Sequence, residues 1–189
     1  MREIEVKLKV NDLNSLEQKL NEAGCVLGGA VHQRDVEYSY MGLNKEFQGF
    51  EEGDMMFRIR YTKGVAILTL KKQMSNEMDN LEYETELSDP ENMHQILLAL
   101  GYKYALEVKK MRRKGKLGEY EICLDEVERL GSFVELEKLT SDEANPDEVV
   151  EDLLKVLPVV LGLEFMMPSG ILMNNLQSFA PIKVFTSVI

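Results

Sequence analysis

The sequence has 189 residues, with 33 Asp and Glu against 22 Lys and Arg, and therefore a formal net charge of −11. This length fits one domain, and a composition with 44% hydrophobic and 29% charged residues excludes wholesale disorder, collagen-like and coiled-coil architectures. The acidic balance disfavours a general nucleic-acid binder, whose affinity comes mostly from basic side chains. We therefore predict a globular domain with no nucleic-acid partner.

Neither end of the sequence nor its interior predicts a membrane segment. Met1 leads directly into a charged stretch instead of the apolar run of a signal peptide. The longest apolar stretch, residues 156–163, is much shorter than the roughly 20 residues that span a bilayer. Cys25 and Cys123 lack the spacing of a zinc site or a disulfide framework. We expect a cytoplasmic protein with no membrane partner.

The chain begins with a strand followed by a helix. Residues 2–10 alternate between apolar side chains and charged ones such as Glu3 and Glu5, which predicts a strand with one apolar and one ionic face. Asp12 is then a suitable N-cap for a helix that Gly24 ends. The same unit of an acidic strand and a capped helix recurs twice, over residues 82–100 and 133–157.

Further strands lie between these units, and glycine turns join several of them. They are predicted over residues 31–40, 55–62, 65–72, 104–114 and 119–126. Tight hairpins favour antiparallel pairing. The pattern predicts an α+β domain built on a large curved or closed antiparallel sheet, with its helices packed outside.

The charged strand faces are segregated by sign. Acidic faces carry Glu3 and Glu5, Glu84 and Glu86, Asp125, and Glu135 and Glu137, whereas basic faces carry Arg58 and Arg60, Lys71, and Lys110 and Arg112. If the sheet closes, these faces line its interior, where buried charge must be paired or must coordinate a ligand. Mg²⁺ and Mn²⁺ prefer carboxylate oxygens, and Arg and Lys bind phosphate oxygens. The pattern therefore predicts a polyanion bound together with divalent cations.

Six motifs in order along residues 3–137 resemble the signature of the CYTH family, the triphosphate tunnel metalloenzymes, which include class IV adenylyl cyclases and thiamine triphosphatases. The motifs are Glu3-Ile4-Glu5-Val6-Lys7 as ExExK, Arg58-Ile59-Arg60 as RxR, Thr69-Leu70-Lys71 as the lysine strand, Glu84-Thr85-Glu86 as the central ExE, Lys110-Met111-Arg112 as KxR, and the block from Leu124 to Glu137. In overall length and in its last block the chain is most similar to the class IV adenylyl cyclase-like branch.

The resemblance implies a fold, a cofactor and roles for individual residues. The fold is a closed eight-stranded antiparallel β-barrel, or tunnel, that binds a triphosphate with Mg²⁺ or Mn²⁺. Glu3, Glu5 and Lys7 would take part in catalysis. The implied metal ligands are Glu3, Glu5, Asp125, Glu135 and Glu137, with Glu84 and Glu86 as further candidates. The implied triphosphate-binding residues are Lys7, Arg58, Arg60, Lys71, Lys110 and Arg112.

We expect residues 1–170 to form a single CYTH domain and residues 171–189 a C-terminal tail of unknown role. The expected partner is a small molecule that contains a triphosphate, and the oligomeric state is left open, a homodimer included. The expected activity is hydrolysis of a nucleoside, thiamine or inorganic triphosphate, or cyclisation of ATP to cyclic AMP. A non-catalytic triphosphate or polyphosphate-binding module is the alternative.

Two departures from the family pattern favour hydrolysis over cyclisation. Glu82 stands where relatives often carry an arginine, and no His-Phe pair precedes Glu3. Because no residue set that would recognise adenine can be identified, the binding energy is expected to come mainly from the triphosphate.

Overall fold

The computed structural model describes residues 2–40, 42, 51–75 and 78–161. Within these residues, eight strands and three helices follow one another along the chain. They are β1 (Arg2–Val10), α1 (Leu13–Glu22), β2 (Val31–Ser39), β3 (Met55–Thr62), β4 (Val65–Gln73), β5 (Asp79–Leu87), α2 (Pro90–Ala99), β6 (Lys103–Leu117), β7 (Tyr120–Val127), β8 (Gly131–Thr140) and α3 (Pro146–Leu161). Strand β5 begins four residues earlier than predicted, and the predicted tail lies outside the described residues.

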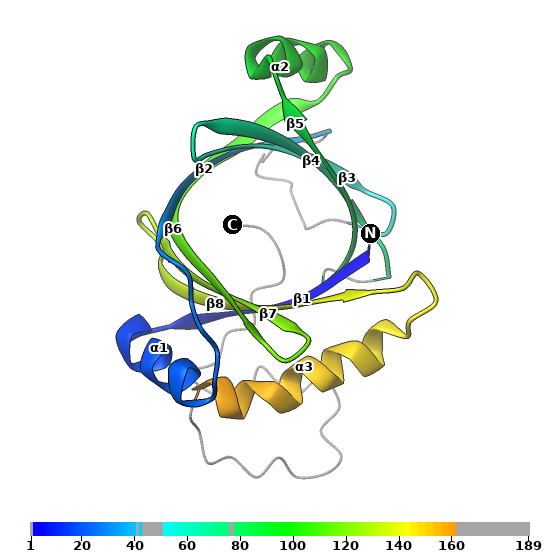
Figure 1. Ribbon diagram of the computed structural model, residues 1–189. Coiled ribbons are helices and arrows are strands. Elements are labelled where there is room, and N and C mark those ends of the chain that lie inside the picture. Colours follow the sequence, from blue (N-terminus) through cyan, green and yellow to red (C-terminus); the bar gives the residue numbers. More distant parts are fainter. Residues whose placement is uncertain (1, 41, 43–50, 76–77, 162–189) are drawn as a thin grey trace.

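The eight strands form a closed antiparallel barrel (Figure 1), which confirms the predicted fold class. Their order around the barrel is β1-β5-β4-β3-β2-β6-β7-β8. Strand β2 is therefore four strands away from β1 in either direction, so these two strands face each other across the interior. Side chains that point inward from β1 and β2 thus form opposite walls of one space.

The largest hydrophobic core lies outside the barrel, between its outer face and helices α1 and α3. Ile4 and Val6 point outward from β1, because every second side chain of a strand lies on the same face. They pack with Leu20 of α1 and Leu153 of α3, and all four side chains are fully buried. Burying an aliphatic side chain of this size stabilises the folded state by about 1.5–3 kcal/mol. Because these side chains point outward, they stabilise the barrel without occupying its interior.

Helix α2 covers another part of the barrel, on the side away from α1 and α3 (Figure 1). Leu97 of α2 packs with Val36 of β2 and Ile59 of β3. Asp89 caps the helix, since its side chain accepts a hydrogen bond from the backbone N–H of Asn92, and Pro90 occupies the first turn. All three helices therefore lie outside the barrel, as predicted. None of the helices in the described ranges is both long enough and apolar enough to span a bilayer.

The barrel closes between β1 and β5 through three paired positions, from Arg2↔Leu81 to Ile4↔Asp79. A buried ion pair supports this short seam: the Arg2 guanidinium donates two hydrogen bonds of 2.7 Å to the Asp79 carboxylate. Arg2 also donates to the backbone carbonyls of Asp142 and Ala144. These bonds fix the first residues of β1, and with them the direction in which Glu3 points.

Candidate functional site

A cavity of about 590 Å³ lies inside the barrel, and all eight strands contribute to its lining. Its ionisable lining residues are Glu3, Glu5, Lys7, Asp35, Glu37, Arg58, Arg60, Lys71, Glu82, Glu84, Lys110, Arg112, Lys114, Glu121, Glu135 and Glu137. Eleven of the thirteen residues that the sequence singled out are among them. Asp125 is fully buried behind the cavity lining, and Glu86 is exposed on β5 outside the cavity.

Three carboxylates gather on one wall, and we refer to Glu3, Glu5 and Glu137 as the carboxylate cluster. One oxygen from each of them lies within 4.8 Å of the others. The cluster comes from neighbouring strands, because Glu5 of β1 is paired directly with Glu137 of β8, while Glu3 is two residues from Glu5 on the same face. Such a set of hard oxygen donors fits a divalent cation.

The carboxylate cluster is electrostatically strained while it holds no cation. Burial, the Glu82 carboxylate and the Glu5 carboxylate raise the pKa of Glu3 to about 7. Burial together with the charges of Glu3 and Glu135 raises the pKa of Glu137 well above its ordinary value. Both shifts mean that the ionised forms are disfavoured there, and a divalent cation would relieve this repulsion.

Glu135 belonged to the predicted metal ligands, but its carboxylate is held by cations. Lys7 Nζ lies 2.6 Å from one oxygen, and Arg112 bonds the other. Burial acts to raise the pKa of Glu135, yet Arg112, Lys7 and Lys110 hold it well below its ordinary value. Glu135 therefore joins the carboxylate cluster to the cationic part of the cavity.

Three of the cations are oriented by two buried aspartates. Arg112 donates to the Asp125 carboxylate through Nε at 2.7 Å and Nη2 at 2.6 Å, and Lys110 Nζ lies 3.0 Å from the same carboxylate. Arg60 makes the same two-pronged contact with Asp35, with both distances 2.8 Å. These pairs fix the direction of the guanidinium groups, which matters for planar recognition of phosphate oxygens.

Two further cations are held by carboxylates that line the cavity. Lys71 Nζ lies 2.8 Å from Glu5 and 3.0 Å from Glu82. Burial lowers the pKa of Lys71, but Glu5, Glu82 and Glu3 together keep it above its ordinary value. Arg58 is held more loosely, since its Nη2 donates to Thr69 at 3.2 Å and to Glu84 at 3.5 Å.

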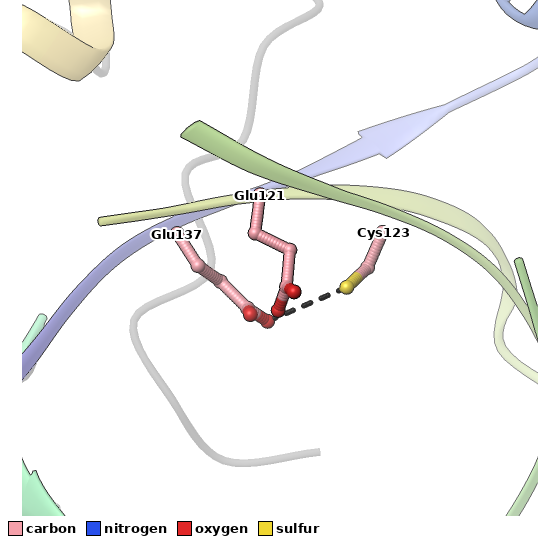
Figure 2. Close-up of side chains that lie close together, drawn as sticks. All are labelled: Glu121, Cys123 and Glu137. Atoms are coloured by element: carbon pink, nitrogen blue, oxygen red, sulfur yellow. Dashed lines mark hydrogen bonds between the residues drawn. The ribbon is translucent and has the colours of Figure 1, made fainter. Parts of the chain in front are cut away.

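A second group of potential ligands adjoins the carboxylate cluster and shares Glu137 with it. Figure 2 shows the side chains of Glu121, Cys123 and Glu137 converging, and their ligand atoms lie within 4.8 Å of one another. The Cys123 thiol donates a hydrogen bond of 3.5 Å to Glu137 (Figure 2), and burial raises its pKa. Cys123, to which the sequence analysis assigned no role in the site, thus contacts a residue of the cavity.

Five charged lining residues were not assigned to the site from the sequence: Asp35, Glu37, Glu82, Lys114 and Glu121. For most of these residues the sequence does carry a signal, which is their spacing of two residues along a strand. Asp35 and Glu37 are two residues apart within a predicted strand, as are the acidic residues of the recognised motifs. Lys114 continues the alternation of Lys110 and Arg112. Glu82 was noted only as a departure, although it precedes Glu84 and Glu86 at the same spacing.

Comparison with known proteins places the chain in a family. The model of the CYTH domain family matches residues 1–165, and the chain belongs to this family. The family acts on triphosphate substrates and uses divalent cations. These properties agree with a cavity that combines a carboxylate cluster with oriented arginines and lysines.

Individual relatives show the same relationship. The chain is 32% identical over 159 residues to the "Putative adenylate cyclase" of Methanocaldococcus jannaschii, covering 83% of this chain and 88% of that protein. The solved structure of the PH1012 protein of Pyrococcus horikoshii OT3 is 29% identical, with a TM-score of 0.68, and covers 86% of this chain and 91% of that one. The "Putative adenylyl cyclase HpAC1" of Hippeastrum shares the fold at 17% identity and a TM-score of 0.52, over 94% of this chain and 95% of that one.

Proposed function

We propose that this protein is a triphosphatase that depends on Mg²⁺ or Mn²⁺ and hydrolyses inorganic tripolyphosphate or organic triphosphates. One observation carries the proposal: a single cavity holds a cluster of three carboxylates whose oxygens lie within 4.8 Å of one another, together with a set of oriented arginines and lysines. A triphosphate with its metal supplies the charges that both parts lack. Either part alone would accommodate only half of that complex.

In this proposal Glu3, Glu5 and Glu137 hold the metal ion. A bound divalent cation neutralises charge on phosphate oxygens and lowers the pKa of a coordinated water. Glu135 and Asp125 are already occupied by Arg112, and we assign them to orienting cations. This assignment narrows the set of metal ligands that the sequence suggested.

The phosphates are bound by Lys7, Arg58, Arg60, Lys71, Lys110 and Arg112. Phosphoryl transfer depends mainly on positioning and on stabilising the charge that develops on the transferred group. Arg60 and Arg112 arrive already oriented by Asp35 and Asp125, so little reorganisation is needed when phosphate binds. Lys71 would exchange part of its contact with Glu5 for phosphate oxygens when Glu5 holds the metal, whereas Lys7 stays beside Glu135.

Cyclisation of ATP is the second candidate, and the name of the Methanocaldococcus relative favours it. In that reaction the ribose 3′-hydroxyl attacks the α-phosphorus and pyrophosphate leaves. The same metal ion and cationic side chains serve both reactions, which differ in the phosphorus atom that faces the nucleophile. The Hippeastrum protein, although named as a putative adenylyl cyclase, has a dominant triphosphatase activity, so such a name is compatible with hydrolysis.

The products formed from two substrates distinguish the candidates. The protein is incubated with ATP or with inorganic tripolyphosphate, with Mg²⁺ or Mn²⁺, and the products are separated chromatographically. We expect phosphate to be released from both substrates at least as fast as cyclic AMP forms from ATP. Cyclic AMP and pyrophosphate as the dominant products, with tripolyphosphate nearly inert, would establish cyclisation instead. Binding of both substrates without turnover would identify a non-catalytic triphosphate-binding module.

A further inference from the structure

Glu37 of β2 is a carboxylate of the cavity wall that makes no hydrogen bond or ion pair with the described residues. Its side chain lines the cavity, and the residue is only 8% exposed. Across the parts of the chain that the structure describes, no hydrogen bond or ion pair reaches its carboxylate, unlike Asp35 two residues earlier. A buried polar group without a partner is costly, which points to a ligand that supplies the missing contact.

The residue beside Glu37 is also incompletely satisfied. Arg58 of β3 is paired directly with Glu37 across the two strands, so both side chains lie on the same face. Arg58 directs Nη2 to Thr69 and Glu84, while its Nε is buried and makes no hydrogen bond. Because Arg58 Nε is buried, it is not accessible to a ligand in the cavity, and the Glu37 carboxylate is the open group of this pair. The ligand group that meets Glu37 must donate a hydrogen bond.

A phosphate oxygen alone does not fit this position. Fully ionised phosphate placed against a carboxylate would bring two anions together in a site of low dielectric constant. A hydroxyl group does fit, because it carries no charge and can donate a hydrogen bond to a carboxylate. Since Glu37 lies among the cations Arg58, Lys71 and Lys110, the hydroxyl must be close to the phosphates in the ligand.

The position of β2 agrees with this requirement. Strand β2 lies opposite β1, which carries two members of the carboxylate cluster. A triphosphate whose metal is held by the cluster would have to extend its remaining atoms across the cavity to reach β2. In a nucleoside triphosphate, the part that follows the phosphates is the sugar, whose hydroxyls are the nearest hydrogen-bond donors.

We propose that Glu37 is a specificity-determining residue that accepts a hydrogen bond from a sugar hydroxyl of a nucleoside triphosphate. This inference rests on the proposed function and refines it, because it selects nucleoside triphosphates over inorganic tripolyphosphate. It involves no contact with the base, so ATP and GTP should bind alike. Rejection of a ligand without the hydroxyl follows from leaving a buried carboxylate unpaired.

The test compares ligands and variants by calorimetry with Ca²⁺ as the divalent cation. The ligands are ATP, 2′,3′-dideoxy-ATP and inorganic tripolyphosphate, and the proteins are the wild type, Glu37→Leu and Glu37→Gln. Glu86→Leu is the matched control, since this glutamate lies outside the cavity. In the wild type, ATP should bind about tenfold or more tightly than 2′,3′-dideoxy-ATP, as expected for a hydrogen bond to a charged group.

The preference for ATP should disappear in Glu37→Leu, where the two nucleotides bind alike. It should persist in part in Glu37→Gln, which keeps an acceptor oxygen, and fully in the control. Non-additive losses from removing the carboxylate and the hydroxyls are the signature of direct contact. Equal binding of the two nucleotides by the wild type, or an unchanged preference in Glu37→Leu, would overturn the assignment. The proposed function is judged separately, from the release of phosphate by the wild type.

Discussion

The buried carboxylates in and around the cavity fall into two kinds that differ in their neighbours. Asp35 and Asp125 each face an arginine through two hydrogen bonds. Although burial acts to raise the pKa of Asp35, Arg60 holds it below its ordinary value. In the carboxylate cluster, by contrast, Glu3 faces Glu5 and Glu82, and its pKa rises to about 7. The anionic form of a carboxyl group is thus stabilised where an arginine faces it and destabilised where it is buried among other carboxylates.

This difference separates two roles. A buried aspartate with an arginine partner holds a cation in place, and removing it leaves an uncompensated charge. A carboxylate that faces other carboxylates stores repulsion that a metal ion relieves. Loss of a paired aspartate should therefore damage the fold, whereas loss of a clustered glutamate should damage metal-dependent activity and leave the fold intact.

The largest effect is expected for Glu5→Ala. Glu5 lies at the centre of the carboxylate cluster, next to Glu3 on β1 and opposite Glu137 of β8. Removing it should lower metal-dependent turnover by about 10³-fold, because the metal both orients water and neutralises developing charge. Phosphate release at saturating Mg²⁺ or Mn²⁺ provides the measurement.

The control for this change is Glu86→Ala, in the exposed part of β5. Both variants should unfold cooperatively at a midpoint near that of the wild type. If Glu5→Ala retains wild-type turnover at saturating metal, the metal does not bind through Glu5.

The next effect is on stability, and Asp125→Asn tests it. Asparagine keeps the size of the side chain but leaves Arg112 and Lys110 without their shared counter-charge in a fully buried position. We expect a loss of about 3–5 kcal/mol in the free energy of unfolding, as for other broken buried pairs. Urea unfolding monitored by circular dichroism measures it. A loss below about 1 kcal/mol would show that Arg112 and Lys110 find other partners without cost.

Strand alternation explains why much of the fold and site could be predicted. Charges repeated at every second residue fix which side chains share a face, so Glu3, Glu5, Arg58 and Arg60 were correctly placed together. The glycine turns indicated antiparallel neighbours, and the capped helices outside the barrel followed from their apolar faces. These are local properties that a single strand or helix carries in its own sequence.

Other features depend on distances between strands that the sequence does not contain. Glu86 shares a strand face with Glu84, but it is paired with Ile67 beyond the cavity, so it does not reach the interior. Asp125 was grouped with the metal ligands through the resemblance to the family, and its position beside Arg112, which the pairing of β6 and β7 sets, could not be read from the sequence. The open carboxylate of Glu37 likewise became visible only when all of its neighbours were in place.

The smallest effect expected here is a pH dependence carried by Glu3. Its pKa is about 7 in the folded protein against an ordinary value of 4.5, so the folded state binds the proton more tightly than the unfolded chain. Between these pH values the unfolded chain ionises Glu3 first, and the wild type loses stability as pH rises; above pH 7 the loss is constant. Glu3→Gln cannot ionise and escapes this loss. In EDTA, the variant should therefore gain stability relative to the wild type between pH 4.5 and 8, by up to about 3 kcal/mol.

Chemical unfolding of both proteins at several pH values in EDTA tests this expectation, and the same series in Mn²⁺ sharpens it. The metal should favour the wild type, because its ionised Glu3 gains a cation that glutamine binds weakly, so the advantage of Glu3→Gln should shrink or reverse. Taking the difference between the two proteins removes the contributions of other groups, such as Asp35 and Glu135, whose lowered pKa values act in the opposite direction. A difference in stability that does not change with pH in EDTA would mean that burial and the charges of Glu82 and Glu5 do not raise the pKa of Glu3, and the contrast between the two kinds of carboxylate would lose its basis.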